Sequence, residues 1–227
     1  MIVAISDVHI GSVFAKQELF FKFLESLPET TTLILLGDIV DTWKDMPKEN
    51  FYKAFLKFPA IFYFPGNHDR EILISQILSP TVQKERIIPV NKLQVLFTHG
   101  DIFDSTAGIE SIFNRVVDAF FYWLSKIIKI DIRTRLEALT NFFYQNLTNF
   151  YKKVVCYMLD KQVDVIVYGH THCPGKQIIQ NKTLFNLGCW YGKPYAFFLK
   201  GDKYAFFEIT ESKLYPEEKD FNDLRGH

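Results

Sequence analysis

Short polar clusters follow five separate hydrophobic runs of this chain, and this alternation is the feature that most constrains its fold. The runs are rich in β-branched and aromatic residues, which predicts β-strands. Together the clusters contain every histidine except His227, and one of them supplies two aspartates instead. Potential metal ligands are therefore predicted at the ends of five strands. The runs are residues 2–5, 33–36, 61–64, 93–97 and 163–167, and the clusters are residues 7–9, 37–41, 66–69, 98–101 and 169–172.

Loops at the carboxyl ends of neighbouring strands converge in open α/β sheets, and ligands bind in the crevice that they form. The clusters offer imidazole, carboxylate and amide oxygen, a mixture that suits divalent Mn, Fe, Zn or Co. They also offer more ligands than one ion needs. We therefore expect a two-metal site, with ions about 3.5–4 Å apart, of the kind that holds a phosphoryl group during in-line displacement.

Composition narrows the class of protein. A chain of 227 residues with 48% hydrophobic content suits one large domain, or a domain with an insertion. The formal charge is zero, so we expect no nucleic-acid partner. Three widely spaced cysteines indicate no disulfide framework. The first strand starts at residue 2, and the longest apolar stretch is too short to span a membrane, so we expect a cytoplasmic protein without a transmembrane helix.

The pattern of the chain predicts an α/β core interrupted by an insertion. Helices are expected over 17–27 and 51–58, between the strand-and-cluster units. Strands with hairpin turns follow the last cluster and should complete a second sheet. They are expected at residues 176–180, 183–187, 195–199 and 203–209, with turns at 181–182 and 201–202. The domain boundaries are a core of residues 1–104 and 161–210, a helical cap of 105–160 and a loose polar tail of 211–227.

The expected cap carries apolar residues at helical spacing over two or three helices. Trp123 and Ile127 add apolar side chains beside the main apolar stripe of the expected helices. Basic residues outnumber acidic ones by seven to four between residues 105 and 159. Aromatic bulk flanked by Lys and Arg suits an interfacial cap that handles acyl chains. Packing against the core, or a dimer contact, accounts for the same pattern equally well, and the oligomeric state is left open.

Any one cluster could be an ordinary turn, since Asn, Asp and Gly favour turns. Five such clusters, each directly after a predicted strand, are not explained by turn formation alone. The motifs D-x-H, G-D-x-x-D, G-N-H-D, H-G-D and G-H-T-H resemble those of the calcineurin-like metallophosphoesterase superfamily. Its fold is a two-sheet β-sandwich flanked by helices. Within it, the chain is similar to the UDP-2,3-diacylglucosamine diphosphatase family through residues 6–12, 37–43, 65–69 and 98–104, the helical insertion and the Gly-x-Trp at Trp190.

The resemblance implies a role for each cluster residue. Asp7, His9 and His172 would bind one metal, Asn67, His99 and His170 the other, and Asp38 would bridge both. His68 would stabilise charge on the phosphoryl group or protonate the leaving group, with Asp69 orienting its ring. Asp101 would either support the site or serve only as a turn residue. The positions expected near the substrate are Asp41, Trp123, Ile127, Arg133 and Trp190.

Two positions depart from the resemblance. Many members have a basic residue where this chain has Cys173, and an Asp where it has Cys189. Neither is a metal position, so the departures bear on the substrate and not on the reaction class. We interpret Cys173 as a small apolar filler rather than an extra ligand.

The resemblance also implies the reaction. Two divalent ions, with Mn²⁺ as the first choice and Zn²⁺, Fe or Co²⁺ as alternatives, would support cleavage of UDP-2,3-diacylglucosamine to UMP and 2,3-diacylglucosamine 1-phosphate in the lipid A pathway. The substrate would be a lipid-linked nucleotide sugar, reached from the inner face of the cytoplasmic membrane. The alternatives are a generic metallophosphoesterase acting on soluble nucleotides or phosphate esters, and a catalytically inactive scaffold of the same fold.

Overall fold

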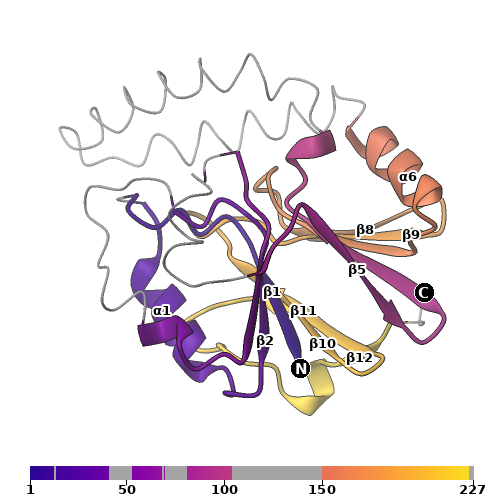
Figure 1. The fold of residues 1–227 in the computed structure, drawn as a ribbon. Coiled ribbons are helices and arrows are strands. Elements are labelled where there is room, and N and C mark those ends of the chain that lie inside the picture. Colours follow the sequence, from indigo (N-terminus) through magenta and orange to yellow (C-terminus); the bar gives the residue numbers. More distant parts are fainter. Residues whose placement is uncertain (13, 41–52, 68, 70–80, 104–149, 225–227) are drawn as a thin grey trace.

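The computed structural model describes residues 1–12, 14–40, 53–67, 69, 81–103 and 150–224. Their strands form two sheets that face each other (Figure 1). The first sheet contains β1 (Ile2–Ile5), β2 (Thr32–Leu35), β3 (Ala60–Tyr63), β4 (Thr81–Val82), β10 (Tyr195–Lys200), β11 (Lys203–Glu208) and β12 (Asn222–Asp223), in the order β12-β11-β10-β1-β2-β3-β4. The second contains β5 (Glu85–Val90), β6 (Leu93–Thr98), β7 (Val165–Tyr168), β8 (Gly175–Ile179) and β9 (Lys182–Asn186), in the order β5-β6-β7-β9-β8.

The central strands of both sheets are buried on both faces, which explains why they are continuous hydrophobic runs. Successive side chains along a strand point to opposite faces. In β1, Ala4 points between the sheets, whereas Val3 and Ile5 point toward α1 (Gln17–Ser26). In β7, Val165 and Val167 likewise point between the sheets. The predicted α/β sandwich of two sheets flanked by helices is confirmed.

Helix α1 covers the outer face of the first sheet and α6 (Phe150–Asp160) covers that of the second (Figure 1). The apolar residues of α1 recur at helical spacing and are buried, as its sequence predicts. Helix α6 buries Phe150, Val154 and Met158 against the second sheet. Residues 150–160 therefore pack against the second sheet, whereas the cap boundary at 160 stays a prediction. The expected cap residues before Phe150, residues 105–149, lie outside the described residues.

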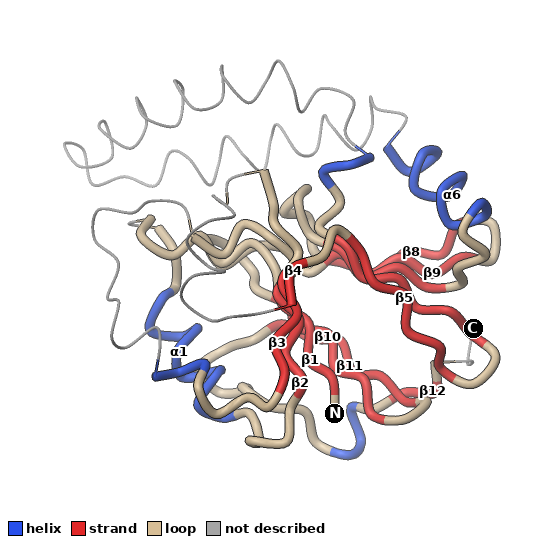
Figure 2. The backbone as a smooth tube through the Cα atoms, in the orientation of Figure 1, coloured by secondary structure: helices blue, strands red, loops and turns tan. Residues whose placement is uncertain are grey.

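Parallel pairing places the ligand clusters at one end of the molecule. Strands β1, β2 and β3 pair in parallel in the first sheet, and β6, β7 and β9 pair in parallel in the second. The loops that follow these strands gather at one end of the two sheets (Figure 2). Loops from both sheets thus meet at the end where the sequence predicts a ligand-binding crevice.

The two C-terminal hairpins form as predicted but do not share a sheet. The hairpin of β8 and β9 turns at Gln180 and Asn181, which both have a positive φ, and joins the second sheet. The hairpin of β10 and β11 turns at Gly201 and pairs with β1 in the first sheet. The expectation that all four strands complete one second sheet is therefore wrong. Pairing between distant strands leaves no local trace in the sequence.

Residues 211–224 are ordered, contrary to the expectation of a loose tail. The 3₁₀ helix η2 (Glu218–Asp220) is closed by a capping box between Glu217 and Asp220. Strand β12 follows and pairs with β11 at the edge of the first sheet. Leu224 is 0% exposed and packs between the two sheets. A single buried leucine among polar residues has no periodicity, which is why the sequence does not reveal it.

Replacing Leu224 tests whether this segment stabilises the sandwich. Leu224→Ala should lower the free energy of unfolding by about 2–5 kcal/mol, because it leaves a cavity between the sheets. Urea unfolding followed by circular dichroism measures this change. Leu159→Ala is the matched control, because Leu159 on α6 is 54% exposed and its loss should change stability by about 0.5 kcal/mol or less. Equal effects of the two substitutions would show that residue 224 is not held in the core.

Candidate metal centre

The loops after β1 and β2 continue the parallel pairing of their strands. The amide of Asp7 donates to the carbonyl of Gly37 over 3.0 Å, and the amide of His9 donates to the carbonyl of Asp38 over 2.9 Å. These hydrogen bonds lock the D-x-H and G-D motifs together. Their side chains are therefore positioned by backbone contacts that do not involve the side chains themselves.

A second pair of loops follows β6 and β7 and contacts the first pair. The amide of Gly169 donates to the carbonyl of His99 over 3.0 Å. The amide of His170 donates to Oδ2 of Asp7 over 3.0 Å, and the amide of Trp190 donates to the carbonyl of Asp7 over 3.0 Å. Asp7 thus receives backbone donors from segments more than 160 residues away in the sequence.

Two glycines allow the loops to approach this closely. Gly37 has a φ of 76°, and a Cβ added there would meet the ring of His99 and the backbone of Gly66. A Cβ on Gly66 would meet the amide nitrogen of Asp38 at 2.6 Å. Larger residues at either position would push the G-D and G-N-H-D loops apart.

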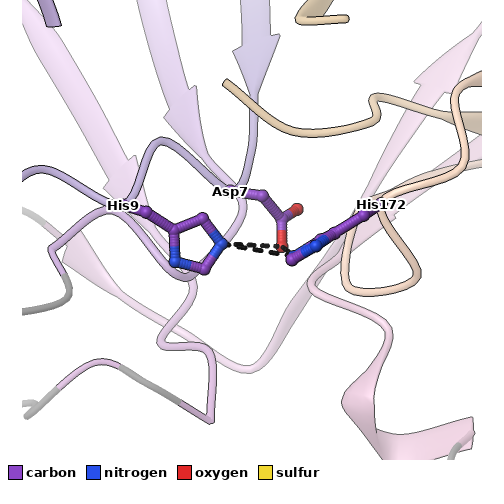
Figure 3. A group of neighbouring side chains, drawn as sticks. All are labelled: Asp7, His9 and His172. Carbon is purple, nitrogen blue, oxygen red and sulfur yellow. Dashed lines mark hydrogen bonds and ion pairs between the residues drawn. The ribbon is translucent and has the colours of Figure 1, made fainter. Parts of the chain in front are cut away.

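The first group of candidate ligands consists of Asp7, His9 and His172, whose side chains point toward one another (Figure 3). Nε2 of His172 lies 3.1 Å from Oδ1 of Asp7 and 3.2 Å from Nε2 of His9. Nε2 of His9 lies 3.9 Å from the same carboxylate oxygen. Asp7 and His9 are fully buried, whereas the His172 side chain is 15% exposed. One oxygen and two nitrogens thus converge in a partly covered site.

The second group consists of Asp38, Asn67, His99 and His170. Nε2 of His99 lies 3.5 Å from Oδ2 of Asp38 and 3.3 Å from Oδ1 of Asn67. The ring centroid of His170 lies 5.3 Å from that of His99. Ligand atoms of Asp7, Asp38 and His99 also lie within 4.8 Å of one another, so the two groups adjoin. That Asp38 bridges two ions stays a prediction.

The donor atoms of both groups are of the kinds that divalent cations bind. Two ligand atoms that each lie about 2.1 Å from one ion are about 3.0–3.4 Å from each other when the ligand–ion–ligand angle lies between the octahedral and the tetrahedral value. The contacts of His172 with Asp7 and His9 fall within this range. Nδ1 of His99 lies 2.8 Å from the carbonyl of Leu36 and donates to it, so Nε2 carries the lone pair of the neutral ring. The donor that faces Asp38 and Asn67 is therefore available to an ion.

Charges of opposite sign shift the pKa values in this site. Burial alone would raise the pKa of Asp7, but the hydrogen bond and charge of His172 hold it below its ordinary value. Burial alone would lower the pKa of His99, but the charge of Asp38 and its hydrogen bond raise it to about 10. Without metal, the positive charge of protonated histidines thus offsets the negative charge of the buried carboxylates. A divalent ion can take the place of such a proton, because both supply positive charge at the same atoms.

Asp69 connects two of the loops. Its Oδ1 accepts from the amides of Ile39 at 3.0 Å and Val40 at 3.2 Å, and its Oδ2 accepts from the amide of Gly66 at 3.1 Å. Burial and the Asp38 charge raise the pKa of Asp69 to about 6. The contacts of Asp69 fasten the G-D loop to the G-N-H-D loop. Its expected orientation of the His68 ring stays a prediction, because His68 lies outside the described residues.

Of the residues expected near the substrate, only Trp190 lies in the part of the chain that the structure describes. Trp190 is 0% exposed and packs against Phe20 and Phe23 of α1, so the expectation that it contacts substrate is wrong. A Gly-x-Trp motif does not reveal which way the indole points. Cys189 is buried, and burial raises the pKa of the half-buried Cys173 thiol. Asp41, Trp123, Ile127 and Arg133 lie outside the described residues.

Three residues that the sequence did not single out support the ligand loops. The Ser6 hydroxyl lies within hydrogen-bond distance of the Asp7 carboxylate and of the Leu36 carbonyl, and it can donate to either. Asn186 donates to the carbonyl of Gly169 and the hydroxyl of Thr171, and accepts from the amide of Gly188. Tyr191 stacks on the ring of His9. The only hint in the sequence is that each lies beside or within a motif.

Comparisons with known proteins agree with this geometry. The family model of calcineurin-like phosphoesterases matches residues 1–174. The UDP-2,3-diacylglucosamine hydrolase of Blochmanniella pennsylvanica (strain BPEN) is 26% identical, and the match covers 94% of this chain and 97% of that protein. Chaetomium thermophilum Vps29 has a similar fold, with a TM-score of 0.54, 12% identity and coverage of 93% of this chain and 92% of that one. For Entamoeba histolytica Vps29 in complex with Zn²⁺ the TM-score is 0.53, with 12% identity and 99% of both chains covered.

The chain belongs to the calcineurin-like phosphoesterase family. The family match spans the five ligand clusters, and the site holds the donor set that divalent ions require. The protein is a metal-dependent hydrolase. The likeness to the Vps29 structures concerns the fold alone.

Removing Asp38 tests the metal centre. Asp38→Ala should lose most bound divalent metal while remaining folded, because its carboxylate supplies negative charge beside both groups. Elemental analysis and circular dichroism measure the two properties. Glu18→Ala removes an exposed carboxylate of α1 and should keep the metal content of the wild type. If Asp38→Ala retained two ions per chain, the site as described would be wrong.

The raised pKa of His99 predicts how the metal-free protein responds to pH. The folded protein holds this proton up to a pH of about 10, whereas the unfolded chain releases it near 6.5. The stability that this proton contributes is thus complete below pH 6.5 and is lost as the pH rises toward 10. In EDTA, the Tm of the wild type should fall more steeply over this window than that of His99→Gln. Parallel Tm profiles for the two proteins would contradict the assignment.

Proposed function

We propose that this hydrolase cleaves the pyrophosphate of UDP-2,3-diacylglucosamine and releases UMP and 2,3-diacylglucosamine 1-phosphate. The observation that carries the proposal is the near full-length similarity to a protein of that activity, whose 97% coverage leaves no large part of it unmatched. The reaction class follows from the family. The choice of a lipid-linked substrate is the further step that the experiment below tests.

The charges of the site support a phosphoryl substrate once cations are present. Asp7 and Asp38 are 0% and 2% exposed, and alone they would repel an anionic pyrophosphate. Bound divalent ions would reverse the sign of the site, polarise a phosphoryl oxygen and lower the pKa of a water molecule. We propose two ions, held by the first and second groups, with Mn²⁺ as the first choice because imidazole, carboxylate and amide donors suit it.

The same proposal includes a membrane surface as the place where the substrate is met. No helix among the described residues is long and apolar enough to cross a membrane. A diacylated sugar nucleotide partitions into a bilayer, so the enzyme would reach it from the surface. Trp123 and Ile127 remain the sequence-based candidates for contacts with the acyl chains.

A comparison of two nucleotide sugars tests the substrate. With Mn²⁺ present, kcat/KM for UDP-2,3-diacylglucosamine should exceed that for UDP-N-acetylglucosamine by about 100-fold or more. Burial of only four methylenes contributes about 3 kcal/mol, which corresponds to that ratio. Mass spectrometry should identify UMP and 2,3-diacylglucosamine 1-phosphate as the products.

Asp38→Ala, purified in the same way, excludes a contaminating hydrolase, since it should have no activity on either compound. Faster cleavage of UDP-N-acetylglucosamine or of bis(4-nitrophenyl) phosphate than of the lipid would reject the proposed substrate. It would instead favour a phosphoesterase that acts on soluble compounds.

A further inference from the structure

An aromatic ring covers one face of a candidate metal ligand. The rings of Tyr191 and His9 are stacked, with centroids 4.6 Å apart and an interplanar angle of 21°. The Tyr191 ring also meets His172 edge-on, with centroids 6.3 Å apart and an angle of 82°. Tyr191 is 6% exposed, so its ring is part of the wall around the first group and not a surface side chain.

Tyr191 is held in place by segments that supply no predicted ligand. Its neighbour Trp190 is anchored in the core, and the Trp190 carbonyl accepts from the amide of Lys16 over 3.0 Å. The amide of Gly192 donates to the carbonyl of Cys189, which closes the turn around Tyr191. Phe14 meets the Tyr191 ring edge-on at 6.4 Å. The ring is therefore a fixed surface against which His9 packs.

A fixed aromatic surface matters to His9 because the ring of a histidine rotates easily about its last side-chain bond. Stacking limits that rotation and keeps Nε2 directed at Asp7 and His172, 3.9 Å and 3.2 Å away. An imidazole that binds a cation also becomes electron-poor. The electron-rich face of a tyrosine then attracts it more strongly than an aliphatic side chain would.

We propose that Tyr191 is a positioning residue for the first group. It holds the His9 ring in the orientation that binds an ion, and so sets the affinity of that ion. The second group, with Asp38, Asn67, His99 and His170, does not depend on this contact for its orientation. The two ions therefore differ in their dependence on residue 191. This inference rests on the proposed two-ion site and is independent of the identity of the substrate.

Titration of metal-free protein with Mn²⁺ tests the proposal without any substrate. The wild type should bind two ions by calorimetry, or by the loss of the electron paramagnetic resonance signal of free Mn²⁺. Tyr191→Leu should bind one ion with native affinity and the other about 10–100-fold more weakly, as when a residue behind a metal ligand is removed. Circular dichroism in EDTA should show that the variant is folded.

Two further variants separate the stack from other effects. Tyr191→Phe keeps the ring and should bind both ions within about 3-fold of the wild type, because the ring and not the hydroxyl makes the contact. Tyr195→Leu makes the same chemical change as Tyr191→Leu in a half-buried tyrosine that packs on Phe206. Both of its ions should bind as in the wild type.

The outcomes are distinguishable. Native affinity for both ions in Tyr191→Leu would overturn the positioning role and leave the metal centre intact. An equal loss of affinity for both ions in Tyr191→Leu would also overturn it. The same holds if Tyr191→Phe and Tyr191→Leu lost equal affinity for the ion of the first group. A wild type that binds no Mn²⁺ would overturn the two-ion site, and this inference with it.

Discussion

A left-handed backbone at the candidate ligands is the constraint on which the site depends. Non-glycine residues adopt a positive φ rarely, although Asp, Asn and His do so more readily than others. Each such residue costs on the order of 1–3 kcal/mol. These residues lie in the loops that follow β1, β2 and β7. The φ values are 50° at Asp7, 55° at His9, 52° at Asp38, 65° at His170 and 55° at His172.

The surrounding core fixes these conformations. The ligand loops after β1, β2, β6 and β7 follow buried strand residues, and backbone hydrogen bonds tie these loops together in pairs. Asn186 and Asp69 satisfy further amides and carbonyls at the same end of the sheets. The site is thus a demanding local arrangement held by an extensive hydrophobic sandwich. Catalytic sites commonly combine local strain with a scaffold that enforces it.

The sequence predicts those parts of the structure that depend on neighbouring residues. The central strands and the clusters after them carry local signals, so residues such as Asp7 and His99 could be proposed as candidate ligands from the sequence, and the structure places them close together. The division of the hairpins between two sheets, and the pairing of β12, depend on contacts across the whole chain. The sequence does not show that Trp190 faces the core, because an indole beside a motif can contact either substrate or core residues. Nor does it reveal Tyr191, because the stacking of this ring on His9 depends on the folded structure.

Each candidate group draws its ligands from both sheets. Asp7 and His9 follow a strand of the first sheet, and His172 follows a strand of the second. Asp38 likewise follows a strand of the first sheet, and His99 follows a strand of the second. A bound ion would therefore act as a cross-link between the two halves of the sandwich, joining side chains 163 residues apart. Such a link shortens the free loops of any partly opened state and disfavours separation of the sheets. Metal occupancy would then govern not only chemistry but also how readily the two sheets part at the end where the candidate ligands lie.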